Sequence, residues 1–191
     1  MHSTHLSDPS PEPTQRLKKR IPAHVKHLLT VPTAANVCWS LDFTSDALTD
    51  SRRFRPLNVL DEYSRQLLDV EIDVELPPAR VVQVLARLVE CHGLPAQLRT
   101  DNGPEFSSAR LSEWCEAQGI ALCWLQLGKL TQIAHIECFN GSFSRELLDA
   151  HLFCLLAHMR QLVDEWMDDY NTQRPHQALN FMTPIEFKQA A

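Results

Sequence analysis

The chain has few glycines, no long apolar run and no apolar segment at its start, and each absence narrows the class of protein. Five glycines among 191 residues exclude glycine-rich low-complexity and collagen-like sequences. No apolar run approaches the roughly 18 to 20 residues that a membrane span requires, and the first residues do not resemble a signal peptide. We therefore expect a protein that has no membrane partner and resides in the cytoplasm.

The six cysteines are widely separated, and no two have the C-x-x-C spacing of a zinc or redox site. They fall in stretches patterned like strands or helices, so we expect packed thiols in a reducing compartment, with no disulfide and no zinc site. His24 and His27 have a spacing that metal ligands use, but without a C-x-x-C pair they are better explained as solvated side chains.

The formal net charge of −6 hides an uneven distribution along the chain. Residues 1–40 contain five basic and two acidic residues, for a net charge of +3, whereas residues 41–191 contain 13 basic and 22 acidic residues, for a net charge of −9. Affinity for nucleic acids comes largely from neutralising phosphates, so the acidic part argues against simple groove binding. Any contact with DNA needs a local source of positive charge.

The length fits one domain with tails, because domains usually have about 100 to 200 residues. Residues 1–35 hold five of the 12 prolines and a cluster of basic residues, which predicts a flexible basic leader. Regular patterning over 36–150 predicts a core, and residues 151–191 are expected to form a C-terminal helix and tail packed on that core.

Five segments have the apolar patterning of strands, and the clearest of them alternate between apolar and polar residues. The segment 67–74 alternates between apolar and polar residues, which is typical of an antiparallel edge strand with one solvated face. The predicted strands are residues 36–43, 54–61, 67–74, 96–100 and 120–125.

Four segments carry helix signals. Pro77-Pro78 opens a helix that His92-Gly93 closes, and Ser107-Ser108 can cap another that stops at Gly119. A third helix extends to about residue 149, and a longer amphipathic helix follows it. Three hairpin-connected strands followed by alternating strands and helices predict an α/β fold, a mixed five-stranded sheet with helices on both faces. The residues expected to be buried in the last two helices are Ile136, Phe139, Phe143 and Leu147, then Leu152, Leu155, Leu156, Met159, Leu162, Val163, Trp166, Met167 and Tyr170.

Three acidic residues occupy positions that such a fold can bring together. Asp42 ends the first strand, Asp101 follows the fourth, and Glu137 lies on the helix after the fifth. Carboxylates are hard oxygen ligands for Mg²⁺, and a pair of such ions about 4 Å apart can catalyse phosphodiester chemistry. Taken singly, Asp42 is also explained as a solvated strand end, and Asp101 as the cap of a turn.

Four sequence motifs together resemble the catalytic core of bacterial insertion-sequence transposases, which are related to retroviral integrases. They are WSLDF (39–43), TDNGPEF (100–106), GKLTQIAHIECFNG (128–141), with 35 residues between Asp101 and Glu137, and YNTQRPHQALNFMTPIEF (170–187). The resemblance implies a ribonuclease H-like fold and an Asp-Asp-Glu site in which Asp42, Asp101 and Glu137 bind Mg²⁺, with Mn²⁺ as a substitute.

The resemblance also implies an activity and its partners. The enzyme would be a transposase of the Asp-Asp-Glu type, a polynucleotidyl transferase that cuts and joins the DNA ends of a mobile element. Lys129, Asn102 and Asn140 are candidate contacts with DNA, although a solvated loop lysine explains Lys129 equally well. Packing or protein contacts explain Arg174 and His176 as well as a functional role does. The leader-like start predicts that a separate helix-turn-helix subunit reads the element ends, and we expect a homo-oligomer on DNA.

The segment from Leu127 to Cys138, which contains Glu137, departs from the family pattern at four positions. The family usually has Pro, Pro, Asn and Arg where this chain has Leu127, Leu130, Ile133 and Cys138. Loss of the prolines loosens the loop and loss of the arginine removes a cation, so a decayed copy with impaired activity is one interpretation.

Two other functions stay open from the sequence. One is a non-catalytic remnant that folds and oligomerises, and the other is a metal-dependent ribonuclease H-like nuclease that acts on RNA–DNA hybrids. The spacing between Asp101 and Glu137 and the C-terminal motif favour the transposase over the nuclease.

Overall fold

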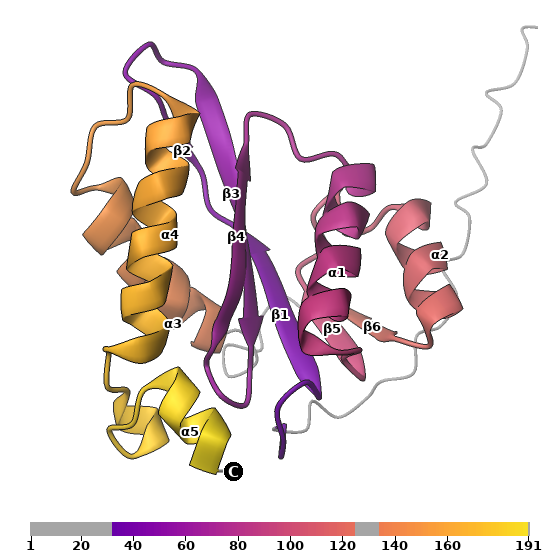
Figure 1. The fold of residues 1–191 in the computed structure, drawn as a ribbon. Coiled ribbons are helices and arrows are strands. Elements are labelled where there is room, and N and C mark those ends of the chain that lie inside the picture. Colours follow the sequence, from indigo (N-terminus) through magenta and orange to yellow (C-terminus); the bar gives the residue numbers. More distant parts are fainter. Residues whose placement is uncertain (1–31, 125–133, 191) are drawn as a thin grey trace, which may run out of the picture.

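A central sheet with helices on both faces forms the protein, whose computed structural model describes residues 32–124 and 134–190 (Figure 1). The five predicted strands are confirmed within a few residues, and they lie in the order β4-β3-β1-β5-β6. A strand of two residues, β2, pairs with the start of β3 and was not expected. The strands are β1 (Cys38–Phe43), β2 (Asp46–Ala47), β3 (Arg53–Asp61), β4 (Leu67–Asp73), β5 (Gln97–Thr100) and β6 (Ala121–Trp124).

The sheet is mixed, as expected. β3 pairs antiparallel with both β1 and β4, and no helix lies between these strands in the sequence. β1, β5 and β6 are parallel, because a helix crosses over between each pair. β4 pairs only with β3 among the described strands, so the prediction of an edge strand is confirmed.

One face of the sheet is covered by α1 (Pro78–His92) and α2 (Ala109–Gln118). The predicted helix ends are confirmed. Pro77 precedes the first turn of α1, and the side chain of Ser108 accepts a hydrogen bond from the Leu111 N–H at the start of α2. α2 ends at Gly119 with a φ of 72°, a left-handed conformation that glycine adopts without steric cost.

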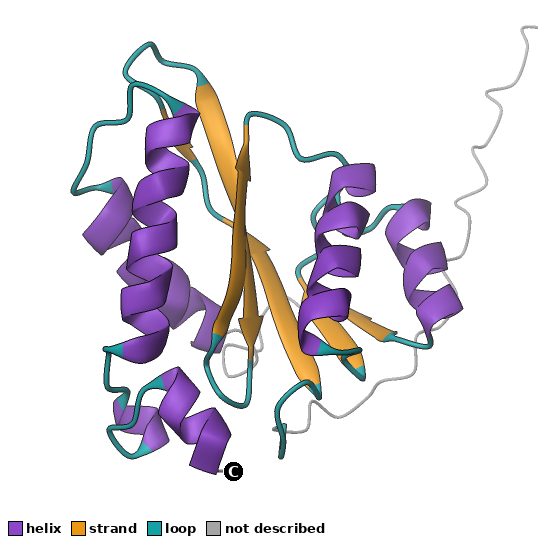
Figure 2. Ribbon diagram, in the orientation of Figure 1, coloured by secondary structure: helices purple, strands orange, loops and turns teal. Residues whose placement is uncertain are grey.

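The other face is covered by α3 (Ala134–Phe143), which continues into a π-helical turn over Ser144–Leu148, and by α4 (Leu156–Thr172). Figure 2 shows these helices on the opposite side of the strands from α1 and α2. The predicted stripe of Ile136, Phe139, Phe143 and Leu147 is buried. A short α5 (Pro184–Ala190) packs against α4.

The expected burial of Leu152 and Leu155 is wrong. Their side chains are 85% and 62% exposed, because α4 begins only at Leu156 and Leu155 has an extended backbone with a φ of −138°. The helical period therefore does not apply before residue 156, and Phe153 is the buried residue of this connection.

The expectation that the cysteines are packed is only partly right. Cys38 and Cys115 are buried, whereas Cys91, Cys138 and Cys154 are exposed, and all six thiols are free. Burial raises the pKa of the Cys115 thiol to about 12. Within residues 32–124 and 134–190, no helix is both long and apolar enough to cross a membrane.

Candidate active site

Asp42 lies near the end of β1 on the face that α3 covers. The neighbouring residues Trp39 and Leu41 point to the α1 and α2 side, and the alternation of a strand turns Asp42 to the opposite side. Its Oδ1 accepts a hydrogen bond from the Phe43 N–H at 2.8 Å, and its Oδ2 accepts one from Asn140 Nδ2 at 2.7 Å. The carboxylate is half-buried and fixed at both oxygens.

The charges of Asp101 and Glu137 act on the carboxylate of Asp42. Burial is the largest cause of a rise in the pKa of Asp42 to about 6, and the negative charges of Asp101 and Glu137 raise it further. The hydrogen bonds from Phe43 and Asn140 oppose that rise. Asp101 and Glu137 therefore lie close enough to Asp42 to influence its protonation.

Asp101 directly follows β5 and is exposed at the start of a tight turn. Its Oδ1 accepts a hydrogen bond from the Gly103 N–H at 2.9 Å, so it does cap the turn, as the simpler interpretation of the sequence held. A Cβ atom at Gly103 would lie 3.0 Å from that same Oδ1, which is too close without a shift. Glycine at this position therefore permits the turn that presents Asp101.

Glu137 is exposed in the first turn of α3, and Asn140 follows it one turn later on the same side of the helix. Asn102 is exposed beside Asp101. Lys129, together with Leu127, Leu130 and Ile133, lies outside the described residues, as do His24 and His27.

Sequence reasoning missed Asn58, a fully buried asparagine on β3. Its Nδ2 donates a hydrogen bond to Asn140 Oδ1 at 2.8 Å, and the register of the sheet places it directly across from Asp42. One signal was available in the sequence, because Asn58 is the only polar residue in the run LNVL (57–60).

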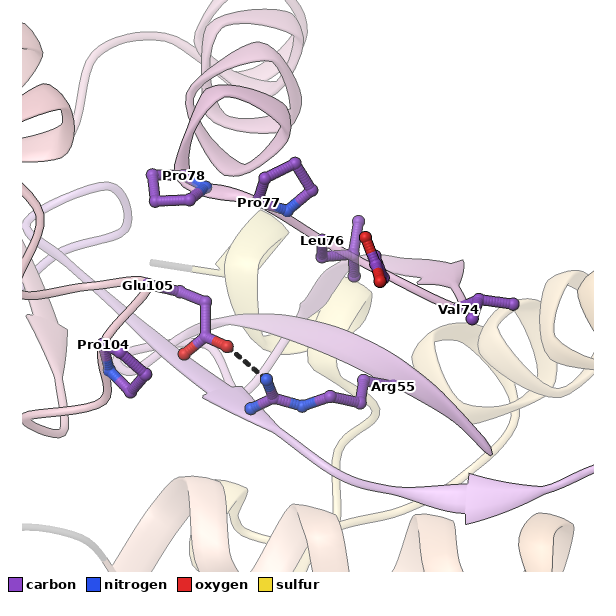
Figure 3. A pocket seen from close by; sticks show the side chains of 8 residues that line it. Arg55, Val74, Leu76, Pro77, Pro78, Pro104 and Glu105 are labelled. Atoms are coloured by element: carbon purple, nitrogen blue, oxygen red, sulfur yellow. Dashed lines mark hydrogen bonds and ion pairs between the residues drawn. The ribbon is translucent and has the colours of Figure 1, made fainter. Parts of the chain in front are cut away.

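A second set of contacts ties the end of β1 to the turn that carries Asp101. The guanidinium of Arg55 lies 4.3 Å from the centre of the Phe43 ring and pairs with Glu105, and Phe43 stacks on Phe106 at 5.1 Å. Figure 3 shows the ion pair at the edge of a cavity of about 350 Å³. The cavity is lined by Arg55, Val74, Glu75, Leu76, Pro77, Pro78, Pro104 and Glu105.

A buried ion pair joins Arg99 on β5 to Glu62, which directly follows β3, and Ser40 Oγ on the intervening strand β1 donates a hydrogen bond to the same carboxylate. Near the start of α3, Arg65 Nη2 lies 2.8 Å from His135 Nε2. Burial, reinforced by the charges of Arg65 and Arg99, lowers the pKa of His135 to about 4. His135 is therefore neutral at pH 7 and accepts the hydrogen bond from Arg65.

The structure gives Arg174 and His176 packing roles. Arg174 Nη1 donates a hydrogen bond to Glu146 Oε1 at 3.0 Å, and its guanidinium lies 5.4 Å from the centre of the Trp166 ring. The ring of His176 packs edge-on against Tyr170 at 4.9 Å. These contacts join the end of α4 to the π-helical turn.

Comparisons with known proteins agree with the motifs. The family model described as integrase core domain matches residues 32–129, and a second with the same description matches 118–184. The IS407 insertion-element protein of Burkholderia multivorans is 44% identical over 83% of this chain and 57% of its own length. The IS476 insertion-element protein of Xanthomonas euvesicatoria is 36% identical over 91% of this chain and 50% of its own length. The chain thus spans about half the length of these relatives.

Solved structures show the same fold. The simian T-cell lymphotropic virus intasome, in complex with the regulatory subunit B56 gamma of PP2A, contains a chain that superimposes with a TM-score of 0.71 at 16% identity, over 85% of this chain and 57% of that one. The catalytic core of HTLV-2 integrase in complex with magnesium gives a TM-score of 0.64 at 17% identity, over 82% of this chain and 98% of that one. The fold is therefore ribonuclease H-like, as the motifs implied, and the chain belongs to the integrase core family, with proteins of insertion elements among its relatives.

Proposed function

We propose that this chain is the catalytic core of a transposase that cleaves and joins the DNA ends of an insertion sequence in a Mg²⁺-dependent reaction. Asp42, Asp101 and Glu137 are the proposed catalytic and metal-binding residues. The observation that carries the proposal is the convergence of charge on Asp42, because the charges of Asp101 and Glu137 both act on this half-buried carboxylate.

The chemistry of the donor set fits a divalent cation. None of the ion pairs between described residues includes Asp42, Asp101 or Glu137, so no cationic side chain compensates their charges there. As the described side chains stand, no three of the His, Cys, Asp and Glu residues form a group that could hold a metal ion, so a cation would have to draw the carboxylates together. When bound, Mg²⁺, or Mn²⁺ in its place, would lower the pKa of an attacking hydroxyl and stabilise charge on the leaving oxygen.

The chain itself contributes orientation. Phe43 N–H and Asn140 hold the Asp42 carboxylate, the Gly103 N–H holds Asp101, and α3 fixes the backbone that carries Glu137. In the proposed first step a water oxygen attacks the phosphorus at the element end, and the bond to the 3′ oxygen breaks to leave a 3′-hydroxyl. That hydroxyl then attacks a phosphodiester of the target, whose own 3′ oxygen leaves, so no covalent protein intermediate forms. Holding the reacting groups in such geometry accounts for a large share of the acceleration of such reactions.

Contacts with DNA are proposed for Lys129, Asn102 and Asn140. The hydrogen bond to Asp42 uses one N–H of the Asn140 amide, and the second N–H can donate to a nucleotide. We further propose a homo-oligomer on DNA and a helix-turn-helix partner that reads the element ends. The related folds support an oligomer, since they come from a viral intasome and from dimeric and trimeric forms of an integrase core. Because the substrate is DNA, we place the reaction in the cytoplasm.

The test compares nicking of an element-end duplex in Mg²⁺ buffer by the parent chain and by the Asp42→Asn, Asp101→Asn and Glu137→Gln variants. Each variant should lose metal-dependent cleavage and keep its fold, as judged by circular dichroism. Asp164→Asn and Glu90→Gln, at exposed acids of α4 and α1, are the matched controls and should retain the parent rate. A parent that nicks no faster than its Asp42→Asn variant contradicts the proposal, and full activity in any one variant removes that residue from the site.

A further inference from the structure

Asn58 is a polar residue in the otherwise apolar run LNVL (57–60). It lies in β3 between Leu57 and Val59 and is 0% exposed. Burial of an amide is unfavourable unless its polar atoms find partners. Among the described residues, Asn58 Oδ1 has no hydrogen-bond partner, so this position carries a polar group at a cost in stability.

The Nδ2 of Asn58 has the partner that Oδ1 lacks. It donates a hydrogen bond to Asn140 Oδ1 at 2.8 Å, and Asn140 Nδ2 donates to Asp42 Oδ2 at 2.7 Å. Asn58 and Asp42 are directly opposite each other on β3 and β1, so a side chain from α3 bridges two neighbours of the same sheet face. Asn58, Asn140 and Asp42 are thus joined in series by two hydrogen bonds, and the second of them ends on the Asp42 carboxylate.

The orientation of the Asn140 amide in this series of hydrogen bonds follows from its chemistry. The Asn140 amide has an acceptor end and a donor end, and a rotation by half a turn exchanges them. If it were reversed, Asn140 Oδ1 would face the Asp42 carboxylate and Nδ2 would face the Nδ2 of Asn58, which are two repulsive contacts. The carboxylate of Asp42, which only accepts, and the donor on Asn58 therefore act together to favour the orientation in which Asn140 donates to Asp42.

We infer that Asn58 is a positioning residue of the proposed active site, which orients the Asn140 amide and through it the Asp42 carboxylate. The inference rests on the proposed function, because it assigns Asn58 a part in the site of Asp42, Asp101 and Glu137. Residues that hydrogen-bond to metal-ligating groups typically change metal affinity or activity by about 10- to 100-fold when they are replaced.

The test is the Asn58→Leu variant of the full chain, because leucine has a similar size and suits the apolar neighbours of this position. We expect its melting temperature to equal or exceed that of the parent, since the unpartnered Oδ1 is removed. The dissociation constant for Mn²⁺, measured by electron paramagnetic resonance, should rise about tenfold. The Mg²⁺ concentration for half-maximal nicking should rise in parallel.

Asn171→Leu is the matched control, because Asn171 is also buried and its amide bonds to the backbone N–H and carbonyl of Leu67 on β4. It should lower the melting temperature and leave the affinity for Mn²⁺ unchanged. A second readout needs no metal, since the side-chain amide resonances of Asn140 should move in Asn58→Leu and stay in place in Asn171→Leu.

The outcomes separate the two proposals. If the parent binds Mn²⁺ in a manner that Asp42→Asn abolishes, but Asn58→Leu binds within twofold of the parent, the positioning role is refuted and the proposed function stands. Unchanged Asn140 resonances in Asn58→Leu refute it as well. If the Asp42→Asn variant binds Mn²⁺ as the parent does, the proposed function fails first and the positioning role fails with it.

Discussion

Replacement of Asp42 by asparagine should stabilise the metal-free chain at neutral pH. The folded structure raises the pKa of Asp42 from 3.8 to about 6, mainly through burial and then through Asp101 and Glu137. Because the folded chain holds this proton more tightly than the unfolded chain does, the contribution of Asp42 to stability is fully present below about pH 4. It is lost as the pH rises through about 6.

The size of the effect follows from the same two pKa values. The difference between pKa values of 3.8 and about 6 corresponds to about 3 kcal/mol, because each pKa unit is worth about 1.4 kcal/mol. An asparagine side chain carries no charge at any pH, so Asp42→Asn should gain up to about 3 kcal/mol over the parent between pH 4 and pH 7.5. Subtracting the parent at each pH removes the contribution of the other carboxylates.

Urea denaturation with a metal chelator, at pH 4 and at pH 7.5, measures this difference directly. Mg²⁺ at about 1,000 times its dissociation constant should reverse the ranking at pH 7.5, because it would stabilise the folded parent by about 4.1 kcal/mol. The Asp164→Asn variant, at an exposed position of α4, is the control and should track the parent at both pH values. A stability difference between Asp42→Asn and the parent that is the same at pH 4 and pH 7.5 would refute the electrostatic account of the site.

Two further predictions concern the turn at Asp101 and the binding of DNA. Gly103→Ala places a Cβ atom 3.0 Å from Asp101 Oδ1, so this carboxylate must shift by a few tenths of an ångström, and we expect nicking to fall while the melting temperature changes little. A Gly103→Ala variant with the parent rate would show that the turn tolerates the shift. The isolated chain should bind DNA weakly and without sequence preference. Its second cationic cluster after the basic leader is partly neutralised, because Arg52 and Arg55 are paired with Asp50 and Glu105. The slope of log affinity against log salt should then be shallow, at about −0.9 for each phosphate neutralised, and tight, selective binding to element-end over scrambled duplex would contradict this.

Local signals explain why so much of the fold was predictable. The alternation in β4 places it at an edge, Ser108 and Gly119 mark the ends of α2, and Pro77 marks the start of α1, all through interactions within a few residues. The start of α4 was not predictable in this way, because Leu152 and Leu155 continue the apolar spacing of the helix while the backbone at Leu155 is extended.

The candidate site also has features that the sequence predicts and features that only the tertiary structure determines. The motifs around Asp42, Asp101 and Glu137 identified the three acids, because residue type and spacing can be taken directly from the sequence. Only the tertiary structure decided how Asp42 is held, since Asn140 is 98 residues from Asp42 and Asn58 is 82 residues from Asn140 along the sequence. The raised pKa of Asp42 likewise depends on burial and on charges contributed by other elements. Residue identity is a local property, whereas hydrogen-bond partners and desolvation exist only once distant segments pack together.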